Sequence, residues 1–192
     1  AKRIIVMENV HQYFTELFVN RVKQIKMGDP THDRTDLGTL VNRDSREILH
    51  QQVIKSINAG AECLIGGKVP PGDGAFYPPT VLIKVKPGMP AFNEELFGPV
   101  ASIISVKNEE EAITLANQSQ FGLGAAVFTT NNKRGRKIAE EKIDSGMCFV
   151  NDFVRSDPRL PFGGIKESGY GRELGKEGIH AFVNLKTVVE KI

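Results

Sequence analysis

Long hydrophobic runs and a charge imbalance are both missing from this 192-residue sequence. Its apolar-rich runs, such as residues 100–106, are far shorter than the ~20 residues that a membrane-spanning helix needs. Its 25 basic and 23 acidic residues nearly cancel to a net charge of +2, and the basic residues are interleaved with acidic ones. That distribution offers no basic patch for nucleic acid. We therefore expect neither a membrane partner nor a nucleic-acid partner.

Cysteine and histidine are scarce and scattered. The two cysteines, Cys63 and Cys148, lie far apart, which excludes a disulfide framework and a metal-binding spacing. Free thiols are typical of a reducing cytoplasm, so we expect a cytoplasmic protein. Both cysteines stand in apolar runs, as inert core cysteines do, which argues against a nucleophile. The four histidines show no metal-ligand spacing, and we expect no metal site.

Hydrophobic residues make up 40% of the sequence and are spread along it, which excludes overall disorder. Their periodicity predicts strands that alternate with helices over short links. The predicted strands are 3–7, 61–65, 81–85, 100–106, 125–129 and 147–151, and the predicted helices are 10–25, 48–57, 109–117 and 133–142. Such alternation implies right-handed crossovers and a mostly parallel sheet flanked by helices, which is an α/β fold.

The last part of the sequence differs from this pattern. A stretch rich in glycine and charge is followed by a predicted helix within residues 172–182. Beyond it, Asn184–Lys191 is predicted to be a strand outside the core, suited to pairing with another chain. We therefore divide the chain into a domain of residues 1–182 and a terminal strand at 183–192. Because the sequence opens with Ala1 directly before a strand, we expect it to belong to a longer protein.

Two loops have compositions suited to ligand contact. Residues 93–99 combine two acids with an aromatic ring. A loop carboxylate can accept hydrogen bonds from ribose hydroxyls and a ring can wall a flat ligand, although a plain turn also fits. Residues 163–175 contain a GxG, but Leu174 stands where a dinucleotide-binding fingerprint has its third glycine. These glycines instead favour positive φ and close backbone packing.

Four segments follow one another in a specific order and spacing: E-E-L-F-G-P at 94–99, Asn117 to Leu123, Asn151, and P-F-G-G-I-K-E-S-G-Y-G-R-E at 161–173. In this combination they resemble the C-terminal half of the NAD(P)-dependent aldehyde dehydrogenase superfamily. The resemblance covers essentially the whole chain and implies the α/β fold of that family's catalytic domain.

The resemblance implies roles for residues of both loops. Glu95 matches the acid that hydrogen-bonds the nicotinamide-side ribose of NAD or NADP, and Phe97 matches the ring that packs beside the nicotinamide. Phe162 matches an aromatic residue that lines the tunnel of the aldehyde substrate. Glu173 matches the acid that closes the G-R-E motif, near the deep end of the active site, where it is a possible supporting residue.

Residues 153–159 match the segment that shapes aldehyde specificity in this family. Arg155 and Ser156 are polar there, where relatives that act on apolar aldehydes have apolar residues, so either one is suited to contact a substrate carboxylate. Residues 1–3 and 26–30 look most like those of bacterial succinate-semialdehyde dehydrogenases. The expected reaction is therefore the oxidation of succinate semialdehyde to succinate.

The family's nucleophilic cysteine, general-base glutamate and Rossmann-like cofactor domain would all precede Ala1, and neither Cys63 nor Cys148 matches the nucleophile. In the complete enzyme, the thiolate attacks the aldehyde, hydride passes to the nicotinamide, and water hydrolyses the thioester. We therefore expect the chain alone to be inactive. The alternative is a stand-alone, non-catalytic module that acts as a binding or assembly partner. Asn184–Lys191 matches the family's oligomerisation strand, which implies a homodimer or homotetramer.

Overall fold

The computed structural model describes residues 3–192, so Ala1 and Lys2, which contribute to the resemblance, lie outside the described residues. The chain divides into two compact units, Ala1–Ala112 and Ile113–Ile192. Each unit has its own sheet structure. Among the described residues, no helix is both long enough and apolar enough to cross a membrane.

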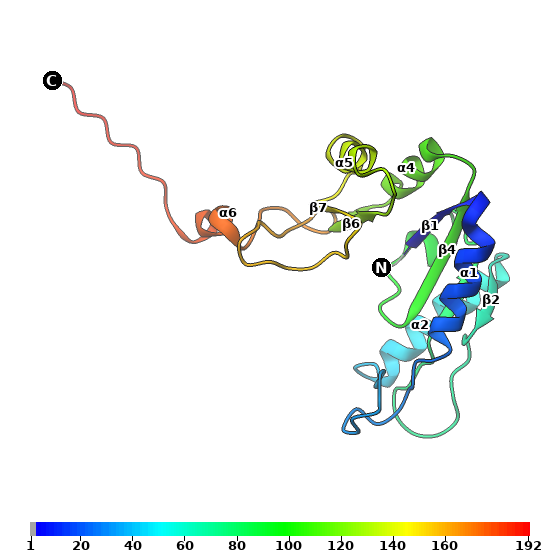
Figure 1. The fold of residues 1–192 in the computed structure, drawn as a ribbon. Coiled ribbons are helices and arrows are strands. Elements are labelled where there is room, and N and C mark those ends of the chain that lie inside the picture. The colour runs from blue at the N-terminus through cyan, green and yellow to red at the C-terminus, as the bar shows by residue number, and fades with distance from the viewer. Residues whose placement is uncertain (1–2) are drawn as a thin grey trace. The chain divides into compact units, whose positions relative to one another are not determined.

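The first unit is built on a four-stranded sheet with the strand order β1-β4-β3-β2 (Figure 1). Its strands are β1 (Arg3–Met7), β2 (Glu62–Ile65), β3 (Thr80–Ile83) and β4 (Val100–Val106). β1, β4 and β3 pair in parallel, whereas β2 pairs antiparallel with β3 at the edge. The mostly parallel sheet is therefore confirmed, and its antiparallel edge is an addition to the predicted topology.

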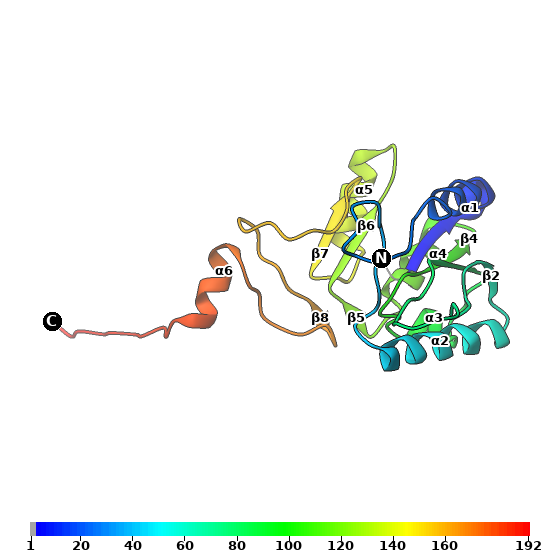
Figure 2. The same ribbon diagram turned by 90° about the horizontal axis from the view of Figure 1, so that it is seen from below.

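Helices cover both faces of this sheet (Figure 2). α1 (Glu8–Val22) packs with Phe14, Phe18 and Val19 on a core of Val6, Val81 and Ile103. α2 (Arg43–Asn58) and the short α3 (Pro90–Asn93) lie on the other face.

Local sequence sets the two ends of α2. The side chain of Asn42 accepts a hydrogen bond from the Ser45 N–H at 2.8 Å, which satisfies a free donor of the first turn. The helix ends just before Gly60, whose φ of 108° suits glycine and few other residues. Both ends of α2 are therefore set by local sequence.

The second unit contains two small sheets. β6 (Gly124–Val127) and β7 (Met147–Val150) pair in parallel, and α5 (Asn132–Glu141) connects them. β5 (Phe121–Gly122) pairs antiparallel with β8 (Ile165–Lys166), which brings the end of α4 (Glu109–Asn117) near the glycine-rich loop. The last helical elements of the unit are α6 (Gly175–Ile179) and a single 3₁₀ turn at His180–Phe182.

The terminal strand predicted to pair with another chain does not form within this single chain. Residues 183–192 follow the 3₁₀ turn as exposed chain without a strand, and the predicted helix within 172–182 is reduced to α6 and that turn. A strand needs a neighbour for its N–H and C=O groups, and a single chain supplies none to this segment. Figure 1 shows the segment in red.

Candidate cofactor and substrate site

The segment that precedes Glu95 and Phe97 is fixed by two serine hydroxyls. Oγ of Ser56 on α2 accepts a hydrogen bond from the Ala91 N–H at 2.9 Å. Oγ of Ser102 on β4 donates a hydrogen bond to the Ala91 carbonyl at 3.2 Å. Both serines are fully buried, so these bonds replace water at the backbone of α3. The sheet and α2 together therefore hold the turn from which the loop starts.

The loop itself is tied to α2. Nε2 of Gln52 donates to Oε2 of Glu94 at 2.9 Å and to the carbonyl of Glu95 at 3.2 Å. Leu96 is buried beneath the loop, with 8% of its surface exposed. Gly98 packs so closely on Leu49 of α2 that a methyl group added there would overlap the leucine side chain. These contacts fix the loop backbone but leave two of its side chains exposed to solvent and without a hydrogen bond to the described chain.

Those two side chains are Glu95 and Phe97. Glu95 is exposed, and among residues 3–192 no side chain holds its carboxylate through a hydrogen bond or ion pair. The ring of Phe97 is 81% exposed, far more than an ordinary phenylalanine in a folded domain. The structure thus brings the two predicted cofactor residues together on one fixed loop. A hydroxyl acceptor two residues away from a free aromatic face can bind a sugar joined to a flat ring.

In the second unit, Phe162 and Glu173 are paired through their backbones. The Phe162 N–H donates to the Glu173 carbonyl at 2.7 Å, and the Glu173 N–H donates back to Phe162 at 2.8 Å. Phe162 is half-buried and the Glu173 side chain is exposed. The next residue, Leu174, has φ 62° and ψ 174°, a conformation that is costly for any residue with a side chain. Such strain concentrates at functional sites, which favours a role for this segment.

The segment of residues 153–159 contains two arginine–carboxylate pairs. Arg155 contacts Asp152 with two nitrogens, at 2.8 and 3.1 Å. Arg159 contacts Asp157 at 2.6 and 2.9 Å and, through its hydrogen bonds, holds the pKa of that carboxyl well below its usual range. Ser156 between them is exposed. The positive charge of Arg155, predicted to meet a substrate carboxylate, is already matched by an acid of this chain.

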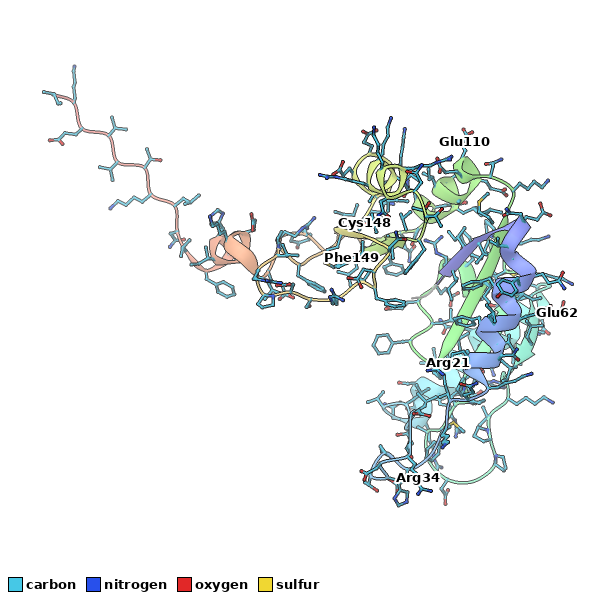
Figure 3. All side chains as sticks on the ribbon, in the orientation of Figure 1. Arg21, Arg34, Glu62, Glu110, Cys148 and Phe149 are labelled. Carbon is cyan, nitrogen blue, oxygen red and sulfur yellow. The ribbon has the colours of Figure 1, made fainter. Side chains whose placement is uncertain are left out.

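Neither cysteine has the surroundings of a nucleophile. Sγ of Cys63 on β2 donates to the Ile65 carbonyl at 3.3 Å, and burial raises the pKa of this thiol. Burial also raises the pKa of Cys148, which lies on β7 beside Phe149 (Figure 3). A raised pKa leaves less thiolate, the form that attacks carbonyls. Both thiols therefore fit the interpretation as inert residues better than a catalytic role.

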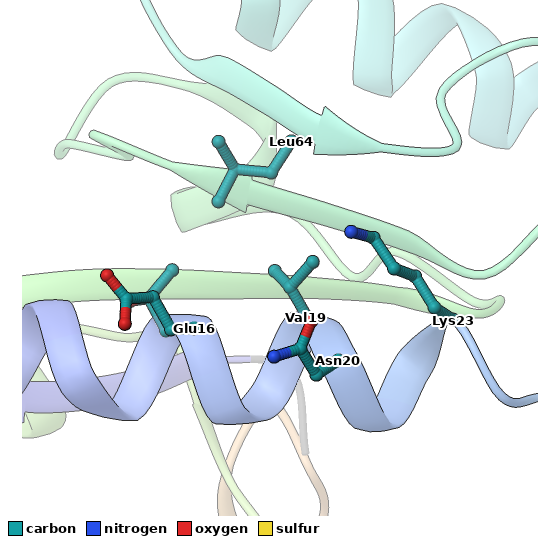
Figure 4. Close-up of a pocket in the computed structure, with 6 residues that line it drawn as sticks. Glu16, Val19, Asn20, Lys23 and Leu64 are labelled. Atoms are coloured by element: carbon teal, nitrogen blue, oxygen red, sulfur yellow. The ribbon is translucent and has the colours of Figure 1, made fainter.

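Two surface grooves have linings that include none of the predicted cofactor or substrate residues. One of about 410 Å³ lies between α1 and Leu64 of β2 (Figure 4), lined by Thr15, Glu16, Val19, Asn20, Lys23 and Leu64. The other, of about 430 Å³, is lined by Asn132, Arg136, Val150 and Asn151. Within residues 3–192, no three His, Cys, Asp or Glu side chains gather in a way that could hold a metal ion.

Sequence reasoning missed the residues that support the loops. Gln52 and Ser56 are one helical turn apart on α2, and both face the segment that leads to Phe97. Their spacing would have shown that they share a helix face, but nothing local connects them to residues about 40 positions later. The backbone pairing of Phe162 with Glu173 likewise closes a loop of glycines that has no hydrophobic pattern to predict it.

Comparison with known proteins identifies the family. The model of the aldehyde dehydrogenase family matches residues 1–188. The succinate semialdehyde dehydrogenase [NAD(P)+] Sad of Escherichia coli K12 is 47% identical over 188 residues, which are 98% of this chain and 40% of that protein. A succinate-semialdehyde dehydrogenase [NADP(+)] of Mycobacterium leprae is 44% identical over 98% of this chain and 41% of its own length.

Solved structures agree with this match. The crystal structure of succinic semialdehyde dehydrogenase from Streptococcus pyogenes, in complex with NADP+, superimposes with a TM-score of 0.91 at 40% identity, covering 95% of this chain and 40% of that one. The chain thus spans about two fifths of the length of these relatives. On the fold, the matched residues and the sequence identity, the chain belongs to the aldehyde dehydrogenase family.

Proposed function

We propose that this chain forms the cofactor-ribose and substrate-binding walls of an NAD(P)+-dependent aldehyde dehydrogenase, with succinate semialdehyde as the substrate. The observation that supports this most directly is the fixed loop on which Glu95 and Phe97, two residues apart, are both exposed. The similarity to succinate-semialdehyde dehydrogenases supports the substrate. Residues 1–182 would belong to the catalytic domain and 183–192 to an oligomerisation segment.

The residues present fit a nicotinamide cofactor, NAD or NADP. The Glu95 carboxylate has acceptor oxygens free of partners among the described side chains, as ribose hydroxyls require. Phe97 offers an open ring face, and Gln52 keeps the backbone between the two residues from shifting. The cofactor, when bound, supplies the acceptor for a hydride from the aldehyde carbon. Glu95 would orient the ribose and Phe97 would limit the positions of the nicotinamide.

The second unit would contact the aldehyde. Phe162 would line the apolar part of the aldehyde, because its side chain is half-buried and its backbone is held by pairing with Glu173. Ser156 has an exposed hydroxyl, while Arg155 is already bound to Asp152. We therefore infer that Ser156 donates the first hydrogen bond to a carboxylate at the far end of the substrate, with the guanidinium of Arg155 shared between that carboxylate and Asp152. Glu173 would support this wall rather than react.

This chain would contribute no attacking atom. The raised pKa of Cys63 and of Cys148 disfavours the thiolate that the thioester chemistry needs. We expect the isolated chain to form no NADH or NADPH from any aldehyde. Turnover by the pure chain that disappears in Cys148→Ser or Cys63→Ser would contradict this part of the proposal.

A chimera tests the cofactor residues. The 188 aligned residues of the E. coli enzyme are replaced by those of this chain, and NAD(P)H formation is measured with succinate semialdehyde. We expect the chimera to turn over. In Glu95→Gln and in Phe97→Ala we expect the KM for the cofactor or the kcat to change about tenfold, which corresponds to about 1.4 kcal/mol. Glu110→Gln, at an exposed acid of α4 (Figure 3), serves as the matched control and should behave as the unsubstituted chimera. A folded chimera that is inactive, or in which Glu95→Gln and the control behave alike, would overturn the proposal.

A further inference from the structure

The loop of residues 162–173 is closed twice, once by its backbone ends and once by a side chain. The ends are the paired Phe162 and Glu173. Inside them, Nη1 of Arg172 donates to the carbonyl of Gly164 at 2.9 Å and to that of Gly171 at 2.6 Å. One nitrogen atom thus connects two backbone positions that are seven residues apart.

Glycine makes this contact sterically possible. A Cβ atom at Gly163 would lie 2.6 Å from the Gly171 carbonyl oxygen and 3.0 Å from Cδ of Arg172. Real Cβ atoms do not approach backbone oxygens so closely, so the arginine stem can lie against the loop only where no side chain intervenes. On the other side, a methyl group at Gly146 would overlap the Gly163 carbonyl. The segment that follows Phe162 is therefore packed between Arg172 and the turn that precedes β7.

The charged guanidinium of Arg172 donates its hydrogen bonds to backbone carbonyl oxygens. Arg172 is half-buried, and no carboxylate among the described residues forms an ion pair with it. Hydrogen bonds from a charged donor are roughly twice as strong as those between neutral groups. Both acceptors lie in glycine peptides, which have the greatest freedom to move when released. Loss of the guanidinium should therefore loosen this loop first.

We propose that Arg172 is a positioning residue that sets the Phe162 ring in the substrate wall by fixing the carbonyls of Gly164 and Gly171. The importance of this placement for catalysis rests on the function proposed above. The placement itself does not, because it concerns contacts within this chain only. The two statements can be tested separately.

The placement is tested by fluorescence, which the absence of tryptophan from the chain allows. Phe162→Trp introduces a single reporter at the ring position. Anisotropy and acrylamide quenching of this tryptophan are compared in the otherwise unchanged chain, in Arg172→Lys and in Arg172→Gln. We expect quenching to increase at least about twofold in Arg172→Gln, with Arg172→Lys in between, because the ammonium keeps the charge with a shorter reach. Arg136→Gln removes an exposed guanidinium of α5 and should leave quenching unchanged.

Hydrogen exchange measured on the same variants, without the tryptophan, separates positioning from general stability. We expect faster exchange confined to residues 160–174, with helical content retained by circular dichroism. Gly146→Ala, which displaces the Gly163 carbonyl without touching Arg172, should loosen the same residues. Unchanged quenching and exchange in a folded Arg172→Gln chain would overturn the proposal. Loosening of the whole second unit would also overturn it, because Arg172 would then support the fold in general.

The catalytic consequence is measured in the chimera described above. We expect Arg172→Lys and Arg172→Gln to raise the KM for succinate semialdehyde, by about tenfold in the glutamine variant, while the kcat of saturated enzyme changes less than the KM. A factor of ten corresponds to about 1.4 kcal/mol. A fall of about tenfold in kcat with an unchanged KM would contradict a positioning role. If the unsubstituted chimera is inactive, the proposed function fails, and the fluorescence and exchange experiments still decide the role of Arg172.

Discussion

Tyr77 lies in the first unit with 1% of its surface exposed, and its hydroxyl lies 3.2 Å from Nδ1 of His50. Burial, reinforced by the nearby Cys63 and Glu47, raises the pKa of Tyr77 far above its usual range. Burial likewise raises the pKa of Cys63 and of Cys148. Three acidic protons are therefore held more tightly by the folded chain than by the unfolded one.

This difference predicts how stability depends on pH. The unfolded chain ionises its cysteines near pH ~8.5 and its tyrosines near pH ~10, before the folded chain can ionise these three groups. The stabilisation is therefore complete below pH ~8.5 and is lost as the pH rises further, because the unfolded state then binds fewer protons. We expect the urea midpoint to fall as the pH rises from about 8.5 to about 11, with the contribution of Tyr77 developing only near pH ~10 and above.

Substitution identifies the responsible groups. Tyr77→Phe should reduce the fall in urea midpoint across this pH interval, whereas Tyr170→Phe, at a fully exposed tyrosine, should leave the fall unchanged. A midpoint that does not change with pH, or an equal fall in both variants, would show that Tyr77 ionises normally in the folded chain.

At the residue scale, the sequence indicates which kinds of residue stand in loops and strands, but not which residues they bond to. The acid and ring at 95 and 97 stand in a loop as expected, and the cysteines lie on strands as expected. The sequence does not reveal that Asp152 already binds Arg155, although the two are three residues apart, because an exposed arginine has several acids within reach. Gln52, 43 residues away from the carbonyl that it holds, has no local signature at all.

At the element scale, α3 shows how a four-residue helix can be fixed. Its Ala91 N–H bonds to Ser56 and its Ala91 carbonyl bonds to Ser102. Ser56→Ala leaves a buried N–H without a partner, which we expect to lower the free energy of unfolding by about 1–3 kcal/mol. We also expect faster hydrogen exchange at residues 91–97 before any other part of the first unit.

The matched control is Ser105→Ala, at an exposed serine of β4. It should change the urea midpoint little, because its hydroxyl faces solvent. If Ser56→Ala is as stable as the control, or if exchange increases equally over the whole sheet, then Ser56 does not position α3. The measurements are urea denaturation and hydrogen exchange read by mass spectrometry.

The success of sequence reasoning varies among the elements for physical reasons. β4 and α4 have the predicted bounds, because β4 is a seven-residue apolar strand and α4 starts with three acids that favour a helix N-terminus. β5 and β8 have two residues each and are too short for any periodicity to show. The antiparallel direction of β2 depends on its connection to β3, which composition does not encode. The alternation of strands and helices is therefore predictable, whereas the edges of the sheets are not.

At the scale of the whole molecule, the exposed segment after the 3₁₀ turn is the feature that most needs a partner. Its apolar side chains Leu185, Val188 and Val189 are 78–89% exposed, and an extended chain leaves its backbone groups unpaired. We propose that Asn184–Lys191 pairs with a second copy of the chain to form a homodimer or homotetramer. Deletion of residues 184–192 should shift the mass measured by light scattering to that of the monomer.

The control for this deletion replaces Lys186 and Lys191 with Gln, which keeps the length and the apolar side chains. That variant should retain the oligomer. An unchanged oligomer after the deletion would show that the assembly uses another surface. A parent chain that is already monomeric would contradict the proposal outright.

The chimera gives the most direct test of the account, through its choice between two aldehydes of equal carbon number. Succinate semialdehyde has a terminal carboxylate and butanal does not, so the comparison reports on the carboxylate contacts proposed for Ser156 and Arg155. We predict that kcat/KM for succinate semialdehyde exceeds that for butanal, and that Ser156→Ala lowers this preference about tenfold, or by about 1.4 kcal/mol. A folded chimera that oxidises neither aldehyde, or that oxidises both equally with and without the Ser156 hydroxyl, would contradict the account.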